Sequence, residues 1–182
     1  MMRQPRAGLL LARWSPQGFV QHRGPDSVAA SIPPPTDVVH FTDPQGAYTI
    51  DIGPEWERMT TTAVKEIEQW AVADVSGGFV SNVNVLTQSA PGMDLQAYLD
   101  VSLRNTGGLN VVDSSIVQTA GADLGLVEFE GVAPGVTISL HFLAVFGVHD
   151  GQAVVATFTA NDKEFAELRP TIEAYLRTLV VT

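Results

Sequence analysis

One segment in the second half of the chain alternates with the period of a β-strand. Within residues 136–148 the even positions are apolar throughout, and they are Ile138, Leu140, Phe142, Ala144 and Phe146. The odd positions mix polar and apolar side chains, and they include Thr137, Ser139, His141, Leu143 and Val145. Because successive side chains of a strand point to opposite faces, this segment predicts a sheet with one face fully covered and the other partly covered.

Turn residues divide the surrounding sequence into further strands. We expect strands at 109–119, 123–132 and 152–160, and the pair Asp150-Gly151 before the last one supplies the positive φ values of a type I′ hairpin turn. A second hairpin is expected at 38–41 and 47–52, around the turn Asp43-Pro44-Gln45-Gly46. Residues 79–88 read as one more strand with one side buried. The sequence therefore predicts consecutive antiparallel strands.

Two helices accompany these strands. Asp94 is a credible N-cap for a helix at 93–104, whose apolar stripe consists of Leu95, Tyr98, Leu99 and Leu103. Asn161-Asp162 caps a terminal helix that carries Phe165, Leu168, Ile172, Leu176 and Leu179, and Pro170 is expected to kink it or to mark its real beginning. Residues 60–70 are ambiguous, and we favour a short helix followed by a strand. The predicted fold class is α+β, with an antiparallel sheet sandwiched by helices.

The first part of the chain has a different composition from the rest. Six of the eleven prolines precede Thr36, and they end in Pro33-Pro34-Pro35, which favours an extended chain and prevents helix or ladder pairing. We therefore predict a Pro-rich, disordered leader at 1–36 and a single α+β domain at 37–182.

The charge of the chain excludes several classes of partner. The formal net charge is −10, and the leader carries four arginines against Asp26, so residues 36–182 hold six basic and nineteen acidic side chains, a net of −13. Nucleic-acid binding needs clustered Lys and Arg, which the domain lacks. No apolar run reaches the roughly 18 residues of a membrane-spanning helix, so we predict no integral membrane segment.

Candidate chemical groups are few. His141 and His149 are expected on one strand about 27 Å apart, too far to share a metal ion, and a triad of His141 with Ser114, Ser115 or Ser139 has no nucleophile-elbow motif to support it. The glycine pairs form no nucleotide-binding motif. We therefore predict no catalytic residue, cofactor site or metal site.

Four polar residues remain as candidates for contact with a partner. Glu128 and Glu130 flank Phe129 and share one face of a strand, where we expect them to be solvated. Asn82 and Asn84 project from the less apolar face of the strand at 79–88. The candidate partner-binding residues are Asn82, Asn84, Glu128 and Glu130.

Several short motifs in order resemble one protein family. They are the segment 41–48 around Asp43-Pro44, Gly53-Pro54-Glu55-Trp56, the strand 79–85, the helix 94–104, and Ala160-Asn161-Asp162 before the closing helix. Over about 38–182 the chain resembles the actinobacterial LpqN-type lipoproteins. That resemblance implies a fold similar to PsbP and the Ran-binding Mog proteins, a binding function without shared catalytic residues, and an extracytoplasmic or secreted location. The chain departs from the family in having no cysteine, so no lipobox can carry a lipid, and Arg13 interrupts the apolar stretch that a signal peptide needs.

Two hypotheses for function follow. The first is a non-catalytic binding module for another protein, which uses a sheet face or a helix-sheet edge. The alternative is a carrier of an apolar small molecule or lipid, in which a curved sheet wraps a long helix around a cavity. A hydrolase that uses Glu128 or His141 is a third interpretation, with no motif to support it.

Overall fold

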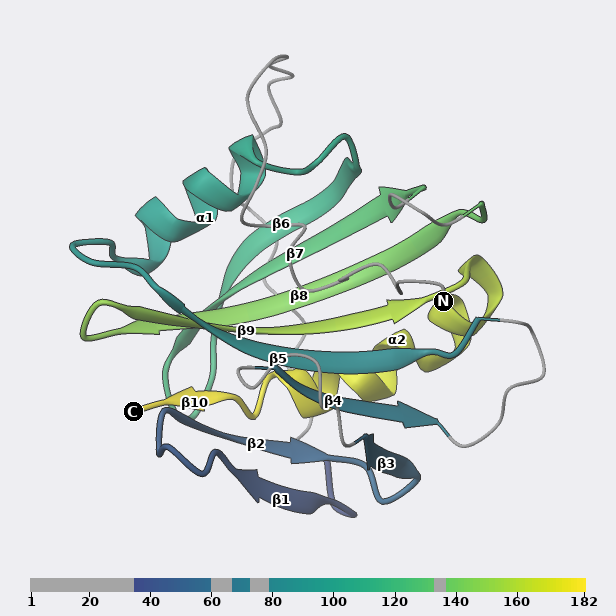
Figure 1. The fold of residues 1–182 in the computed structure, drawn as a ribbon, viewed down its shortest axis with the longest axis horizontal. Coiled ribbons are helices and arrows are strands. Elements are labelled where there is room, and N and C mark those ends of the chain that lie inside the picture. Colours follow the sequence, from purple (N-terminus) through teal and green to yellow (C-terminus); the bar gives the residue numbers. More distant parts are fainter. Residues whose placement is uncertain (1–34, 60–66, 73–78, 133–136) are drawn as a thin grey trace, which may run out of the picture.

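The computed structural model describes residues 35–59, 67–72, 79–132 and 137–182 (Figure 1). The predicted leader lies outside the described residues except for its last two positions, so the boundary near Thr36 stays a prediction. Most of the ambiguous segment at 60–70 also lies outside them.

The described residues form ten strands and two helices. In chain order they are β1 (Val39–Thr42), β2 (Tyr48–Ile52), β3 (Trp56–Met59), β4 (Ile67–Val72), β5 (Asn82–Ser89), α1 (Leu95–Arg104), β6 (Asn110–Gln118), β7 (Asp123–Gly131), β8 (Leu140–His149), β9 (Gln152–Ala160), α2 (Asp162–Leu176) and β10 (Val180–Val181).

These strands form two antiparallel sheets. The larger has the order β3-β4-β5-β9-β8-β7-β6, and the smaller has the order β1-β2-β10. The predicted hairpin of β1 and β2 is confirmed by the register that pairs Val39 with Ile52. The turn between β8 and β9 is also confirmed, because Asp150 has a φ of 44° and Gly151 a φ of 76°. The consecutive strands β6 to β9 are neighbours, as predicted.

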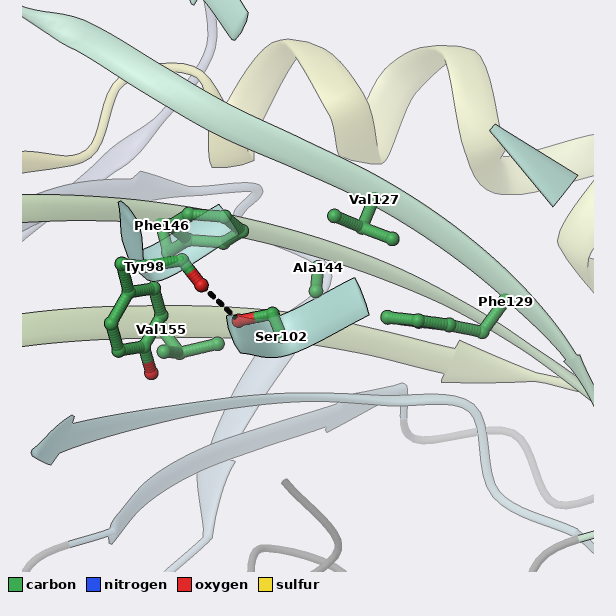
Figure 2. A pocket seen from close by; sticks show the side chains of 7 residues that line it. All are labelled: Tyr98, Ser102, Val127, Phe129, Ala144, Phe146 and Val155. Atoms are coloured by element: carbon green, nitrogen blue, oxygen red, sulfur yellow. Dashed lines mark hydrogen bonds between the residues drawn. The ribbon is translucent and has the colours of Figure 1, made fainter. Parts of the chain in front are cut away.

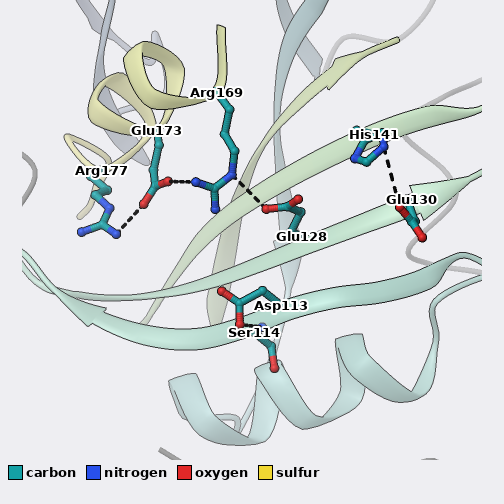
Figure 3. Close-up of polar contacts among 8 residues, drawn as sticks. All are labelled: Asp113, Ser114, Glu128, Glu130, His141, Arg169, Glu173 and Arg177. Atoms are coloured by element: carbon teal, nitrogen blue, oxygen red, sulfur yellow. Dashed lines mark hydrogen bonds and ion pairs between the residues drawn. The ribbon is translucent and has the colours of Figure 1, made fainter. Parts of the chain in front are cut away.

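The two helices cover opposite faces of the larger sheet, which confirms the predicted sandwich. Figure 3 shows α2 in yellow on one side of the strands and α1 in pale teal on the other. One core lies between α2, the small sheet and the large sheet, and its centre includes Leu143, Val145, Phe158, Ile172 and Leu176. The second core lies under α1 and includes Tyr98, Val127, Phe129, Phe146 and Val155.

As expected, the odd-numbered face of β8 is only partly covered, because the side chains of His141 and His149 near its ends are 20% and 54% exposed, but the centre of the strand is buried on both faces. On β8 the even-numbered Phe146 packs under α1, while the odd-numbered Leu143 and Val145 are fully buried on the face that α2 covers. Long apolar strands with both faces buried are what a sheet between two helical layers requires. The strand also begins at Leu140, later than the pattern suggested.

Both predicted helix caps are present. The side chain of Asp94 accepts a hydrogen bond from the amide of Ala97 at 2.8 Å, and that of Asn161 accepts one from Glu164 at 3.0 Å. The terminal helix begins at Asp162 and continues through Pro170, so the proline does not mark its start. The strand expected at the end of the ambiguous segment is present as Ile67–Val72, and the short helix expected before it lies outside the described residues. The short strands β3 and β10 were not predicted. Neither described helix is long and apolar enough to cross a membrane.

Candidate functional site

The four predicted partner-binding residues do not form one site. In the register of the large sheet, Asn82 lies opposite Thr159 and Thr159 lies opposite Phe142, which belongs to the core under α1. Cross-strand partners share a face, so Asn82 and Asn84 point to the α1 side. Glu128 lies opposite Leu143 of the other core. Glu128 and Glu130 therefore point to the α2 side.

Glu128 is tied into a chain of ion pairs between the sheet and α2. It is only 9% exposed, and it accepts a hydrogen bond from Nε of Arg169 at 2.9 Å. Arg169 also lies 3.0 Å from Glu173, which in turn binds Arg177 one helical turn further on (Figure 3). The expectation that Glu128 is solvated is wrong, because α2 covers its face of the sheet and supplies an arginine.

This chain of charges was missed at the level of the sequence, although half of it has a local signal. Arg169, Glu173 and Arg177 recur at a spacing of four residues, which brings side chains together on one face of a helix. The spacing could have suggested the two pairs within α2. It could not have supplied Glu128, which is 41 positions away from Arg169.

Glu130 lies beside His141 near the first turn of α2. The Nε2 atom of His141 is 3.7 Å from Glu130 and 3.4 Å from Asp162, and its ring packs at 4.8 Å from the ring of Phe165. The side chain of Glu130 is 44% exposed, so it can reach a partner. The imagined triad with Ser114 is wrong, because Ser114 lies opposite Val127 and thus on the α1 face. No group of three or more His, Asp or Glu side chains among the described residues is arranged so that it could hold a metal ion.

On the other face, the two asparagines are held close to the domain. The amide of Asn82 donates a hydrogen bond to the carbonyl of Val80 at 3.0 Å, and Asn84 is 7% exposed. Asn84 can therefore contact a partner only if its surroundings rearrange. A partner-binding role for these asparagines and for the two glutamates stays a prediction.

A narrow apolar crevice runs beneath α1 (Figure 2). Its walls are formed by Tyr98, Ser102, Val127, Phe129, Ala144, Phe146 and Val155. The two polar side chains are satisfied internally, since the hydroxyl of Tyr98 donates to Gln88 at 2.9 Å and that of Ser102 donates to the carbonyl of Tyr98. Burial raises the pKa of Tyr98 to about 12. The crevice has no room even for a water molecule, so a carried ligand would require α1 to move.

The positive charges of the described domain are largely used within it. Arg58 donates two hydrogen bonds of 2.8 Å to Glu68, and Arg169 and Arg177 both bind Glu173. These are three of the five cations in the described residues, the others being Arg104 and Lys163. Exposed carboxylates therefore outnumber the cations left to balance them, and the surface is acidic.

Comparison with known proteins shows the fold. No family model matches the sequence, and no curated protein matches it either. Among solved structures, the Ran-binding protein Mog1p of Saccharomyces cerevisiae is 12% identical over 80% of this chain and 95% of its own, with a TM-score of 0.57. Cyanobacterial PsbP from Synechocystis is 11% identical over 87% of this chain and 98% of its own, with a TM-score of 0.54.

LpqN of Mycobacterium tuberculosis, described as involved in cell envelope biogenesis, is also similar in structure. It is 10% identical over 80% of this chain and 91% of its own, with a TM-score of 0.58. The chain therefore has the PsbP/Mog-like fold that its short motifs implied. Identities this low establish the fold and transfer no individual residue.

Proposed function

We propose that this chain is a non-catalytic binding module for a protein partner with a cationic surface. The observation that carries the proposal is the pairing of Arg58, Arg169 and Arg177 with glutamates of the same domain. Because these cations are occupied, the remaining carboxylates give the surface a negative potential that attracts and orients a positively charged partner.

The similar structures support a binding role and suggest a cellular setting. Mog1p is a Ran-binding protein, and LpqN is involved in envelope biogenesis. On the basis of that likeness and the order of short motifs, we propose that the chain is of the LpqN type and acts outside the cytoplasm. Sequencing the N-terminus of protein recovered separately from cells and medium tests this location. Recovery from the cytoplasm alone would contradict it.

Of the four candidate residues, Glu130 is the best placed to contact a partner. Its side chain is 44% exposed, and it has His141 of the adjacent strand beside it but no Lys or Arg on β7. Asn82 is the candidate contact residue on the opposite face of the sheet. Glu128 and Asn84 are buried, so we propose that they act by holding the sheet in shape beneath those contacts.

Photo-crosslinking tests the proposal on both faces. A photoreactive residue replaces Glu130 or Asn82 in the full chain, which is then exposed to soluble and envelope fractions of the source organism. We expect one protein to be captured repeatedly at one position and to be lost at about 0.5 M salt, because the screening length falls well below 10 Å there. Failure to capture any protein at either position would exclude these two faces as the contact surface, and absence of any salt-sensitive partner on the immobilised full chain in the same fractions would contradict the proposal.

The carrier hypothesis is tested in the same preparation. The apolar lining of the crevice under α1 favours an apolar ligand, whereas its lack of space opposes one. Native mass spectrometry of the purified chain decides between them. Detection of one bound lipid per chain would favour the carrier hypothesis over the protein-binding proposal. A mass that corresponds to the chain alone would rule out the carrier hypothesis.

A further inference from the structure

The two sheets leave strand edges of very different length. Along the described strands, the outer members of the sheets are β1 and β10 in one and β3 and β6 in the other. The first three are two to four residues long, and β3 carries Glu57 and Arg58. Short strands and charged side chains are the usual means by which proteins prevent pairing at an edge. β6 has nine residues and is the exception.

The backbone of β6 can be divided into groups that face β7 and groups that face outward. The amide of Thr119 donates to the carbonyl of Ala122 across the turn at 3.1 Å. In an antiparallel pair, residues alternate between facing the partner and facing away. Val117 and Ser115 therefore face β7, while the amides and carbonyls of Ser114, Ile116 and Gln118 face outward.

A second hydrogen bond agrees with this assignment. The amide of Ser114 donates to the side chain of Asp113 at 2.8 Å, as is possible for an amide that faces away from β7. A β-bulge between Val111 and Asp113 also disrupts the edge at this end. Bulges and inward-turned charges protect edges, so the first half of β6 is protected.

The second half of β6 has no such protection. Residues 114–118 contain no charge, proline or glycine, and the side chain of Ile116 is 40% exposed. The outward amides and carbonyls of Ile116 and Gln118 have no neighbouring strand among the described residues. An edge of this kind can accept an added strand, whose backbone supplies hydrogen bonds and whose side chains supply selectivity.

We propose that the outer edge of β6 at residues 114–118 binds an extended, cationic segment of a partner protein as an added strand. This rests on the proposed function and assigns it a surface. Asp113 lies at one end of the open edge, and Asp123 lies opposite Gln118 at the other. Neither β6 nor β7 contains Lys or Arg. A segment with apolar β-branched residues between basic ends matches both features.

A second copy of the chain is a poorer occupant of the same edge. Each copy has a formal net charge of −10, so edge-to-edge pairing would bring two acidic domains together. A cationic peptide, in contrast, is attracted by the negative potential of the domain.

Titration of the isotope-labelled full chain by nuclear magnetic resonance tests the inference. The probe is the peptide acetyl-Lys-Lys-Val-Thr-Val-Thr-Val-Lys-Lys-amide, and the control peptide has Glu in place of each Lys. We expect shifts at the amides of 114–118 and at least tenfold weaker binding of the control peptide. Ile116→Pro removes an outward amide, and we expect it to weaken binding at least tenfold, whereas Ile116→Val keeps the amide and binds within about twofold.

Gln118→Pro gives a second test of the same kind if Ile116→Pro does not fold. The inference is overturned if neither proline variant weakens binding, if both peptides bind alike, or if no shifts appear at millimolar peptide. Shifts at 114–118 that grow with protein concentration without peptide would identify a second copy as the occupant and also overturn it. Peptide shifts around Asn82 or Glu130 would overturn the edge while the proposed binding function stands.

Discussion

Glu173 is the side chain whose removal should most disturb the contact between α2 and the sheet. It is 4% exposed, and its two oxygens bind Arg169 and Arg177. A hydrogen bond to a charged group contributes about 1.5–3 kcal/mol, but Arg169 is about one-third exposed and regains hydration when its partner is lost. We therefore expect Glu173→Ala to lower the free energy of unfolding by about 3 kcal/mol, at the lower end of the range for breaking a buried pair.

Urea denaturation measures this loss directly. With a slope of about 2 kcal/mol per molar urea for a domain of this size, the midpoint should fall by about 1.5 M. Glu167→Ala is the matched control, because Glu167 is exposed on the same helix and should change stability by no more than about 0.5 kcal/mol. Equal midpoints for the two variants would refute the argument that the ion-pair chain holds α2 in place.

Three further predictions concern the core, a tyrosine and a turn. Gly125→Ala places a Cβ 2.3 Å from the ring of Phe146, so we expect a loss of about 1–3 kcal/mol in urea denaturation, partly restored by Phe146→Leu. Burial raises the pKa of Tyr98 to about 12. The neutral phenol therefore stabilises the folded state fully below the unfolded pKa of about 10, and this stabilisation is lost as the pH rises from about 10 to 12. The Tyr98→Phe variant should lose less stability than the unchanged chain across that pH window. Gly151→Ala forces a side chain into a φ of 76°, and thermal denaturation should show a loss of about 1 kcal/mol or more.

The features predicted correctly from the sequence depend on interactions within a few residues. Asp94 and Asn161 cap helices because a short side chain reaches an amide three positions later. Asp150-Gly151 forms its turn because both residues tolerate positive φ. The order of strands β6 to β9 then follows, since short turns make consecutive strands neighbours.

The features that were missed depend on contacts between distant segments. β10 is two residues long and pairs with β2, where Val180 lies opposite Thr49, and no local pattern predicts such a pairing. Alternation correctly gave the two faces of β8, but it could not show that α2 covers the face that carries Glu128. The expectation that Glu128 is solvated was wrong for this reason, because burial of a carboxylate depends on an arginine in another element.

The direction of the backbone groups in β6 makes a prediction about stability that is independent of any ligand. Ser115 and Ile116 are adjacent, but the alternation turns the amide of Ser115 towards β7 and that of Ile116 outward. Ser115→Pro should remove a hydrogen bond of the ladder and leave a carbonyl of β7 unsatisfied, a loss of about 3 kcal/mol. Ile116→Pro removes no ladder bond and should cost about 1 kcal/mol, mainly from the restricted backbone.

Urea denaturation of the two proline variants compares these costs in the same strand. Equal losses, or a larger loss for Ile116→Pro, would show that the assignment of outward groups is wrong, and the strand-addition proposal would then fail with it. A larger loss of stability for Ser115→Pro than for Ile116→Pro would establish that the amide of Ile116 is free to bond to another chain. The reason is that a proline is tolerated within a sheet only where its missing amide has no partner strand.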